Sequence, residues 1–313
     1  MKLLFETAYN DYLLYVNVKQ KNQSKRTIED VFKNHILPYW KNYDIYEITD
    51  SDYINWQNII LSKNYKYTYL KKIHYSMSAI FEYLIKFKNL EKNIAKEVGC
   101  FKKSLETKIE HNYYNRKEFK KFIKNVDNEV YKIFFLFMFY TGTRPGEAMA
   151  LKFSNINNNK ISINKSIEEH IDKYTKKRII STTKNIYSNR IINIDRKLKK
   201  DILYLKKYYM QKYNIENYDY FIFGGIKPLA PTSIRRNIKK ASIKAGVKYI
   251  KIHEFRHSHA SLLYKSGIPI IEISKRLGHN NITTTVNTYI HTDNKQEKRV
   301  IKTLSLIRLF QTF

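Results

Sequence analysis

Arginine and histidine residues recur in three separate segments of the sequence, T-G-T-R-P-G-E, H-E-F-R-H-S-H and L-G-H-N-N. Pro145 suits the first position of a helix, so Arg144 is expected at a helix N-terminus, where backbone N–H groups also favour an anion. Arg256 is expected at the start of a second helix, and His279 just beyond the end of a third. Planar, permanently charged guanidinium groups bind phosphate well. These residues therefore predict a phosphate site.

A zinc site is the competing interpretation, because His253 to His257 fits H-E-x-x-H, the helix pattern of zinc proteases. In a helix, His253 and His257 would share a face. However, Arg256 would stand beside the metal and repel it, and the helix is expected to begin only at about His253. The sequence also lacks the paired carboxylates of two-metal nucleases. We expect chemistry without metal, cofactor or ATP, and structural roles for His257 and His259.

The charge balance favours a polyanionic partner. The chain has 313 residues, with 58 Lys and Arg against 28 Asp and Glu, a formal net charge of +30 that is spread along its length. A drift toward AT-rich codons is the alternative explanation of the lysine excess. The single Cys100 cannot form an internal disulfide, and the longest apolar run is too short to span a bilayer. We expect a cytoplasmic protein without a membrane partner.

Hydrophobic periodicity predicts helices in the first third of the chain. One runs from Glu6 to Gln20, and another begins near Thr27 and runs to about Leu37, where Pro38 should stop it. A third follows Thr49, and a fourth covers Lys66 to Lys86. The pattern breaks over residues 99–111, which predicts a linker between a helical domain at 1–98 and a second domain at 112–313.

The second domain combines helices with a short run of strands. Alternating apolar residues predict three short strands before helices return. The fold class expected is mainly α, with a helical first domain and a mixed, mostly helical second domain that contains a small three-stranded antiparallel sheet. The expected strands are 160–167, 177–182 and 190–194, and the expected helices are 116–125, 129–140, 195–213 and 233–245.

The segments T-G-T-R-P-G-E-A-M-A-L, H-E-F-R-H-S-H-A-S-L-L and L-G-H-N-N-I-T-T-T-V-N-T-Y-I-H resemble, in residue type, order and spacing, the motif boxes of the tyrosine recombinases, the phage integrase family. The boxes span Thr141 to His291, and the helical N-terminal segment is similar to that family's core-binding domain. The resemblance implies a core-type DNA-binding domain at 1–98 and a catalytic domain at 112–313. It also implies site-specific recombination through a 3′-phosphotyrosyl intermediate.

The resemblance also implies a role for each matching residue. Tyr289 is the nucleophile, and His253 is the general base that helps it lose a proton whose ordinary pKa is about 10. Arg144 and Arg256 clamp the non-bridging phosphate oxygens, where charge increases in the transition state. His279 donates a hydrogen bond to the phosphate.

Two further roles follow from the resemblance. Lys184 matches the β-hairpin lysine that protonates the departing 5′ oxygen, although Lys176 and Lys177 lie close by in the sequence. Glu147 lies one helical turn from Arg144 and is interpreted as a partner that orients it. One departure from the family pattern is the Pro-Gly pair after the first arginine, which a helix start tolerates.

The expected partners are double-stranded DNA and further copies of the chain, as a homotetramer on two recombination sites. Accessory DNA-bending proteins are a further candidate partner. Integration or excision of a phage or mobile element is the main functional hypothesis. Chromosome or plasmid dimer resolution by the same chemistry, and a catalytically inactive DNA-binding protein, stay open. So does the beginning of the chain, which fits either the shorter two-domain members of the family or a fragment without an arm-binding domain. The amphipathic tail after Tyr289 could dock on a neighbouring subunit or pack within its own chain.

Overall fold

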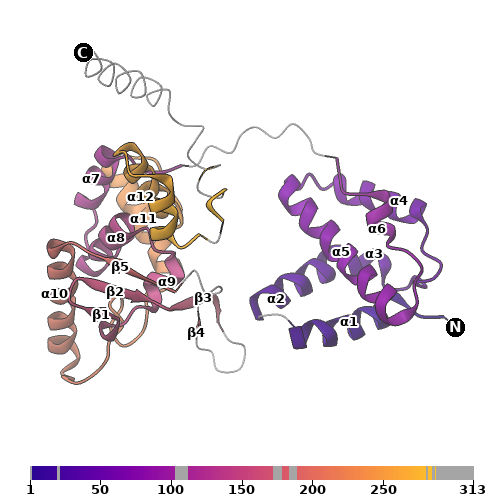
Figure 1. Ribbon diagram of the computed structural model, residues 1–313, viewed down its shortest axis with the longest axis horizontal. Coiled ribbons are helices and arrows are strands. Elements are labelled where there is room, and N and C mark those ends of the chain that lie inside the picture. The colour runs from indigo at the N-terminus through magenta and orange to yellow at the C-terminus, as the bar shows by residue number, and fades with distance from the viewer. Residues whose placement is uncertain are drawn as a thin grey trace, which may run out of the picture. The chain divides into compact units, whose positions relative to one another are not determined.

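The computed structural model describes residues 2–19, 22–102, 112–171, 178–182, 189–279, 281–283 and 286, with only the backbone described at 19, 22–24 and 169–171. The chain divides into two compact units, Met1–Ile109 and Glu110–Phe313 (Figure 1). Most of the expected linker lies outside the described residues. None of the described helices is both long enough and apolar enough to cross a membrane.

The first unit is a bundle of helices around an aromatic core. Trp40 and Trp56 are fully buried, with their ring centroids 6.1 Å apart. The helix expected after Thr49 begins there, because the Thr49 and Asp52 side chains form a reciprocal capping box. The elements are α1 Phe5–Lys19, α2 Asn22–Val31, a π-helical turn Phe32–Ile36, α3 Leu37–Trp40, α4 Asp50–Leu61, α5 Tyr67–Lys88 and α6 Ile94–Val98.

The helix that was expected to stop at Pro38 instead continues through it. Helix α2 begins before Thr27, passes into the π-helical turn and leads directly to α3. Proline has no N–H and clashes with the carbonyl four residues earlier. The wider turn, in which the Leu37 N–H donates to the Phe32 carbonyl, changes the local hydrogen-bond register just before the proline. The prediction that Pro38 ends the helix was therefore wrong.

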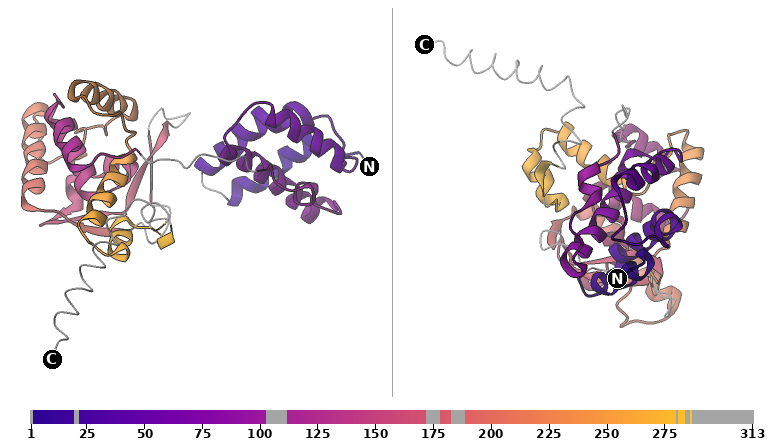
Figure 2. Two further views of the ribbon diagram at one scale, coloured as in Figure 1. Left: turned by 90° about the horizontal axis from the view of Figure 1, so that it is seen from above. Right: turned by 90° about the vertical axis from the view of Figure 1, so that its right-hand side faces the viewer.

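The second unit is mostly helical with small antiparallel sheets, which confirms the expected fold class (Figures 1 and 2). The four helices whose bounds were expected match to within about two residues at each end, the usual scatter of helix boundaries. The helical elements of this unit are α7 Arg116–Lys124, α8 Glu129–Thr141, α9 Pro145–Ala150, a 3-10 turn Phe153–Asn155, α10 Arg196–Tyr213, α11 Pro231–Ala245, α12 Glu254–Lys265 and α13 Ile270–Leu277.

The strands differ from the expectation in how they pair. The single strand expected at 160–167 is divided at Asn164 into two strands that belong to different sheets. Isoleucines at 161, 163 and 167 keep the same alternation across the break, so the pattern could not reveal it. Strands β1 Ile156–Asn157, β2 Lys160–Ile163 and β5 Arg190–Asn193 form one antiparallel sheet, and β3 Lys165–Ile171 pairs with β4 Arg178–Thr182 in another.

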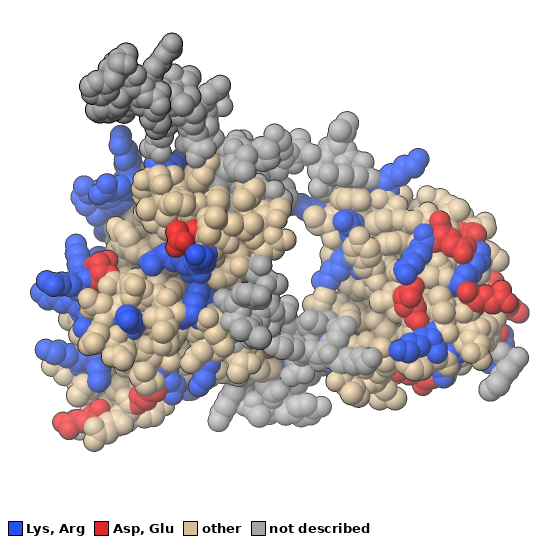
Figure 3. All heavy atoms as spheres, viewed as in Figure 1, with Lys and Arg blue, Asp and Glu red and all other residues tan. Residues whose placement is uncertain are grey.

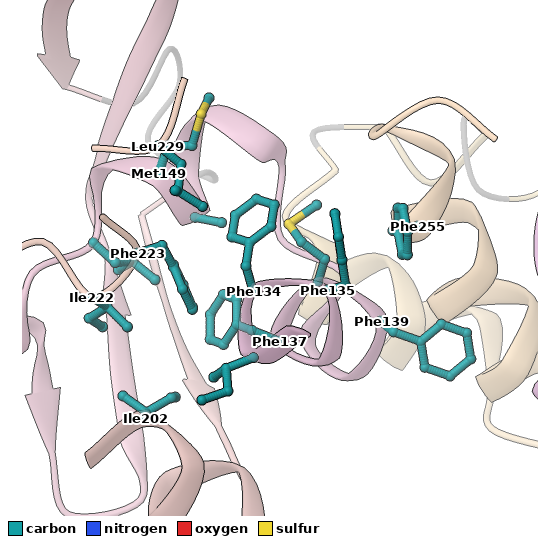
Figure 4. Close-up of a cluster of buried hydrophobic side chains, with 14 of the residues drawn as sticks. Phe134, Phe135, Phe137, Phe139, Met149, Ile202, Ile222, Phe223, Leu229 and Phe255 are labelled. Carbon is teal, nitrogen blue, oxygen red and sulfur yellow. The ribbon is translucent and has the colours of Figure 1, made fainter. Parts of the chain in front are cut away.

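Helix α8 is the centre of the second unit and is apolar on most of its surface (Figure 4). On one side, Phe134 and Phe137 pack against Phe223, with ring centroids 5.1 and 5.2 Å apart. On another, Phe135 stacks on Phe255 of α12 at 5.3 Å. Close packing over most of its surface holds this helix firmly in place. The T-G-T-R segment that follows α8 therefore begins from a fixed point.

Candidate active site

The turn that ends α8 brings three helices together at Gly142. Gly142 has φ +67°, a left-handed conformation that favours glycine. A Cβ atom built there would lie 2.5 Å from the His259 ring on α12 and 2.8 Å from Leu277 on α13. The Gly142 carbonyl also accepts a hydrogen bond of 2.9 Å from Nη1 of Arg256. The close approach of these elements therefore depends on the absence of a side chain.

Arg144 stands at the N-terminus of α9, as the sequence predicts, with Pro145 in the first turn. Its side chain is 35% exposed. Nη1 donates to Oε1 of Glu147 at 2.8 Å, and Nη2 donates to the carbonyl of Gly278 at 3.1 Å. The guanidinium group is thus held between the start of α9 and the end of α13, with part of its surface open.

Glu147 is 2% exposed and accepts hydrogen bonds from two arginines. Besides the bond from Arg144, it accepts hydrogen bonds from Nη1 and Nη2 of Arg190, at 3.1 and 2.7 Å. Burial raises the pKa of Glu147, but the Arg190 hydrogen bonds and the charges of Arg190 and Arg144 outweigh burial and lower the pKa below its ordinary value. The carboxylate is therefore ionised at neutral pH and fixes both guanidinium groups.

Arg256 lies in the first turn of α12 and is only 3% exposed. His253, directly before the helix, is exposed. The rings of His253 and His257 are 5.5 Å apart and nearly perpendicular. Both the arginine and the first histidine of the H-E-F-R-H segment are thus positioned by one helix start, as the sequence predicts.

His279 lies just past the end of α13, also as predicted. Gly278 adopts a left-handed conformation, and the His279 N–H donates to the Ser274 carbonyl at 3.2 Å. This arrangement is a Schellman-type helix end. Burial, followed by the charges of Arg256 and Arg144, lowers the pKa of His279 to about 3. The positive charges of both arginines therefore disfavour protonation of His279, and its imidazole is neutral at pH 7.

A second histidine, His259, connects the helices that carry the site. Nδ1 of His259 lies 2.9 Å from the Phe139 carbonyl, and Nε of Arg276 donates to Nε2 at 3.2 Å. Because Nε2 accepts, Nδ1 carries the proton and donates it to the carbonyl. Burial, followed by the Arg276 charge, lowers the pKa of His259 to about 3. This histidine is neutral and joins α8, α12 and α13, which fits the structural role expected for it.

Sequence reasoning missed Arg190 and Arg276. Arg190 is opposite Ile163 in the sheet, and its Nε donates to the Arg276 carbonyl at 2.9 Å. An arginine side chain only 8% exposed at a strand end indicates a buried carboxylate nearby. That signal is readable only once the strand register places Arg190 beside Glu147.

The proposed nucleophile Tyr289 and the proposed general acid Lys184, with Lys176 and Lys177, lie outside the described residues. Their roles stay predictions. In the part of the chain that the structure describes, no three His, Cys, Asp or Glu side chains are grouped as the ligands of a metal ion. The described part of the site is therefore composed of arginines, histidines and one carboxylate.

Comparison with known proteins places this geometry in a family. Residues 112–296 match the phage integrase family, and residues 4–61 match the phage integrase N-terminal SAM-like domain. The chain belongs to the phage integrase family. Membership makes it a site-specific tyrosine recombinase, an enzyme that breaks and rejoins DNA strands, which confirms the expectation from the motif boxes.

Integrases and recombinases are among its relatives. The ICEBs1 integrase of Bacillus subtilis is 27% identical over 306 residues, covering 95% of this chain and 82% of the relative. A XerC-like tyrosine recombinase of Caldanaerobacter subterraneus is 26% identical over 310 residues, covering 88% of this chain and 76% of the relative.

Solved structures share the fold at lower identity. The Tn1549 transposon integrase in complex with transposon right end DNA has a TM-score of 0.77 at 18% identity, covering 97% of this chain and 100% of that chain. A lambda integrase dimer bound to a core site has a TM-score of 0.67 at 15% identity, covering 92% of this chain and 77% of that one. The fold of both units therefore has precedents in this family.

Proposed function

We propose that Arg144, Arg256 and His279 bind one backbone phosphate of duplex DNA, and that Tyr289 attacks it. The observation that carries the proposal is the meeting of these three side chains from distant segments. Arg144 bonds to the carbonyl of the residue before His279, and both arginines lower the pKa of His279. A site whose cations disfavour a further positive charge favours an anion.

The reaction exchanges one oxygen on phosphorus for another. The Tyr289 oxygen bonds to phosphorus while the bond to the 5′ oxygen breaks, which leaves a 3′-phosphotyrosyl link and a 5′-hydroxyl. His253 takes the tyrosine proton, and Lys184 gives a proton to the departing oxygen. Arg144 and Arg256 stabilise the extra charge of the five-coordinate transition state. Rejoining is the reverse attack by a 5′-hydroxyl, and the phosphotyrosyl link supplies the bond energy without ATP.

Neutral His279 suits this task. An imidazole with a pKa of about 3 is neutral and keeps one N–H to donate to a phosphate oxygen. Binding of the phosphate would raise its pKa, because an opposite charge favours the protonated form. Glu147 takes no part in the reaction under this proposal. It holds Arg144 and Arg190 in place from the buried side of the site.

The biological role we propose is integration or excision of a mobile element or phage, carried out by a homotetramer on two DNA sites. The integrase names among the relatives and the similarity to a lambda integrase tetramer bound to a Holliday junction support it. The XerC-like relative keeps dimer resolution as the second candidate. Accessory DNA-bending proteins stay a prediction.

A nicked duplex that traps the cleaved strand tests the assignment of the arginines. Arg144→Gln should lower the single-turnover cleavage rate by about 10²–10³, the effect of losing one preorganised donor. Binding to the same duplex should change little, because only one of many phosphate contacts is removed. The matched control is Lys120→Gln on α7, an exposed cation outside the site.

Cleavage by Arg144→Gln within about threefold of the wild-type rate would contradict a direct role in stabilising the transition state. A chain that only bound DNA would give a different result. It would bind the nicked duplexes of a site library but yield no covalent product from any of them.

A further inference from the structure

A second basic surface lies on the catalytic unit, along α10. An open hollow of about 570 Å³ has Arg196, Lys199, Lys200 and Lys207 in its wall. A second hollow, of about 440 Å³, adjoins it and shares Asn159 and Lys199 with it. It adds Lys160 from β2. These six residues are called the outer groove below.

The spacing of the α10 cations puts them on one stripe. Positions 196, 199, 200 and 207 differ by three, four and seven residues, the intervals that share a helix face. At 1.5 Å per residue, Arg196 and Lys207 are about 16 Å apart along the helix axis. That length corresponds to roughly five base pairs of duplex DNA, which rises 3.4 Å per pair on each strand. A line of cations of this length suits an extended backbone better than a small ligand.

Among the residues that line its two hollows, the outer groove carries positive charge and no negative charge. Among the described residues, no salt bridge involves its five cations, and no acidic residue lines either hollow. On α11, by contrast, Lys240 and Lys244 both pair with Asp127. Like charges three and four residues apart destabilise a helix. An external polyanion would remove that repulsion.

Uncharged polar side chains in the same hollows also have the chemistry of backbone contacts to nucleic acid. Asn159 offers an amide donor, and the Tyr204 side chain in the same hollow is 52% exposed. Arginine, lysine, asparagine and tyrosine are residues that contact phosphate and sugar in protein–DNA interfaces. A surface of this kind holds DNA without reading its sequence.

The outer groove is separate from the candidate active site. Asn159 and Lys160 lie at the start of β2, whereas the β3–β4 hairpin follows its end. In the sheet, Asn193 is opposite Lys160 and Arg190 is opposite Ile163, so the two sites are at opposite ends of β5. Helix α10 forms the edge of the unit away from the β3–β4 hairpin (Figures 1 and 2), and Lys and Arg side chains project along that edge (Figure 3).

We propose that the outer groove binds the backbone of a second segment of duplex DNA, distinct from the segment that is cut. Each protomer then contacts two DNA segments, one to be cut and one held without sequence reading. The inference goes beyond the proposed function and does not depend on which residues perform the cleavage.

The experiment compares the full chain with two variants of equal charge change. The groove variant removes four cations from α10, and the control removes four exposed cations from α7. The groove variant is Arg196→Gln, Lys199→Gln, Lys200→Gln and Lys207→Gln, and the control is Lys117→Gln, Lys120→Gln, Lys121→Gln and Lys124→Gln. Sedimentation measures how many 12-base-pair duplexes of random sequence bind per protomer at rising salt.

The wild-type chain and the control variant should bind two such duplexes per protomer, and the groove variant one. The weaker of the two sites should also show a salt slope of about 3–4 in log–log form, the value for about four phosphate contacts. An equal stoichiometry for wild type and groove variant, or an equal loss in the control, would overturn the proposal. So would displacement of the second duplex by RNA or poly-glutamate more readily than by DNA. Cleavage of a nicked duplex at the wild-type rate by the groove variant separates this result from any failure of the proposed catalytic roles.

Discussion

At the residue scale, Glu147 is the carboxylate that positions both Arg144 and Arg190. It accepts hydrogen bonds from Arg144 and Arg190 while nearly all of its surface is buried. Breaking such a buried pair by removing one partner leaves an uncompensated charge. The same carboxylate would repel a phosphate if it were exposed, so its burial behind the guanidinium groups is what makes it compatible with an anion site.

Glu147→Gln should therefore lower the free energy of unfolding by about 3–5 kcal/mol, because Arg190 loses its buried counter-charge. Urea unfolding at pH 7 measures the effect. The double variant Glu147→Gln with Arg190→Met should be more stable than the sum of the two single variants predicts. The control is Glu272→Gln, whose exposed pair with Lys275 should contribute less than about 1 kcal/mol. Equal effects at positions 147 and 272 would contradict this account.

The buried neutral histidine makes a prediction about pH. His259 has a folded-state pKa of about 3, below the ordinary value of about 6.5 that it regains on unfolding. Between these values the unfolded chain binds a proton that the folded chain does not, so stability falls as the pH is lowered from about 6.5. His259→Gln should reduce the slope of unfolding free energy against pH by up to about 1.4 kcal/mol per unit between pH 6 and 4. An unchanged slope would show that His259 is already protonated or exposed.

At the element scale, the site depends on three helix ends that meet without a gap. Gly142 ends α8, Arg144 begins α9 and Gly278 ends α13, while α12 supplies Arg256. The proposed catalytic side chains are thus fixed by helix termini whose backbones approach closely. Their geometry is sensitive to any bulk added at the contact point.

Gly142→Ala should destabilise the protein much more than Gly246→Ala. Both glycines have positive φ, but a Cβ at Gly142 meets the His259 ring, whereas a Cβ at Gly246 meets open space. The control should cost about 1–2 kcal/mol for the left-handed backbone alone. Overpacking should add roughly 1–3 kcal/mol at Gly142 and slow cleavage by displacing Arg256. Thermal unfolding measures the difference, and equal losses would show that the helices can move apart freely.

Features encoded locally could be predicted from the sequence. Thr49 with Asp52, Pro145 after Arg144 and Gly278 before His279 are helix-end signals, and each one places its element correctly. The motif boxes identified the family because they include the helix ends at Arg144 and His279.

Features that depend on distant partners could not be predicted. The division at Asn164 is decided by which strand pairs on each side, and the helix passes Pro38 because a π-helical turn precedes it. Arg190 became recognisable only when the register brought it beside Glu147.

At the scale of the whole molecule, the excess of positive charge is the dominant property. The formal net charge of +30 attracts any polyanion over long distances at low salt. The proposed phosphate-binding arginines and the proposed DNA contact at the outer groove are positions where that attraction would become a defined contact. Salt should therefore weaken the sequence-independent affinity for DNA without acting directly on the chemistry at the site.

Affinity for a duplex of random sequence should fall steeply with salt. If six to ten phosphates are contacted, the association constant should drop by about 10³–10⁵ between 50 and 200 mM salt. Fluorescence anisotropy with a labelled duplex measures it. An affinity that barely changes over this range would mean that the charge excess is a product of composition and plays no part in binding.

The identity of the covalently attached residue is the most direct test of the central claim. The wild-type chain is reacted with a library of nicked duplexes, digested with nuclease and trypsin, and examined by mass spectrometry. A nucleotide remnant on Tyr289, abolished by Tyr289→Phe while DNA binding is retained, is the predicted result. A remnant on any other residue, or an adduct that persists in Tyr289→Phe, would contradict the account.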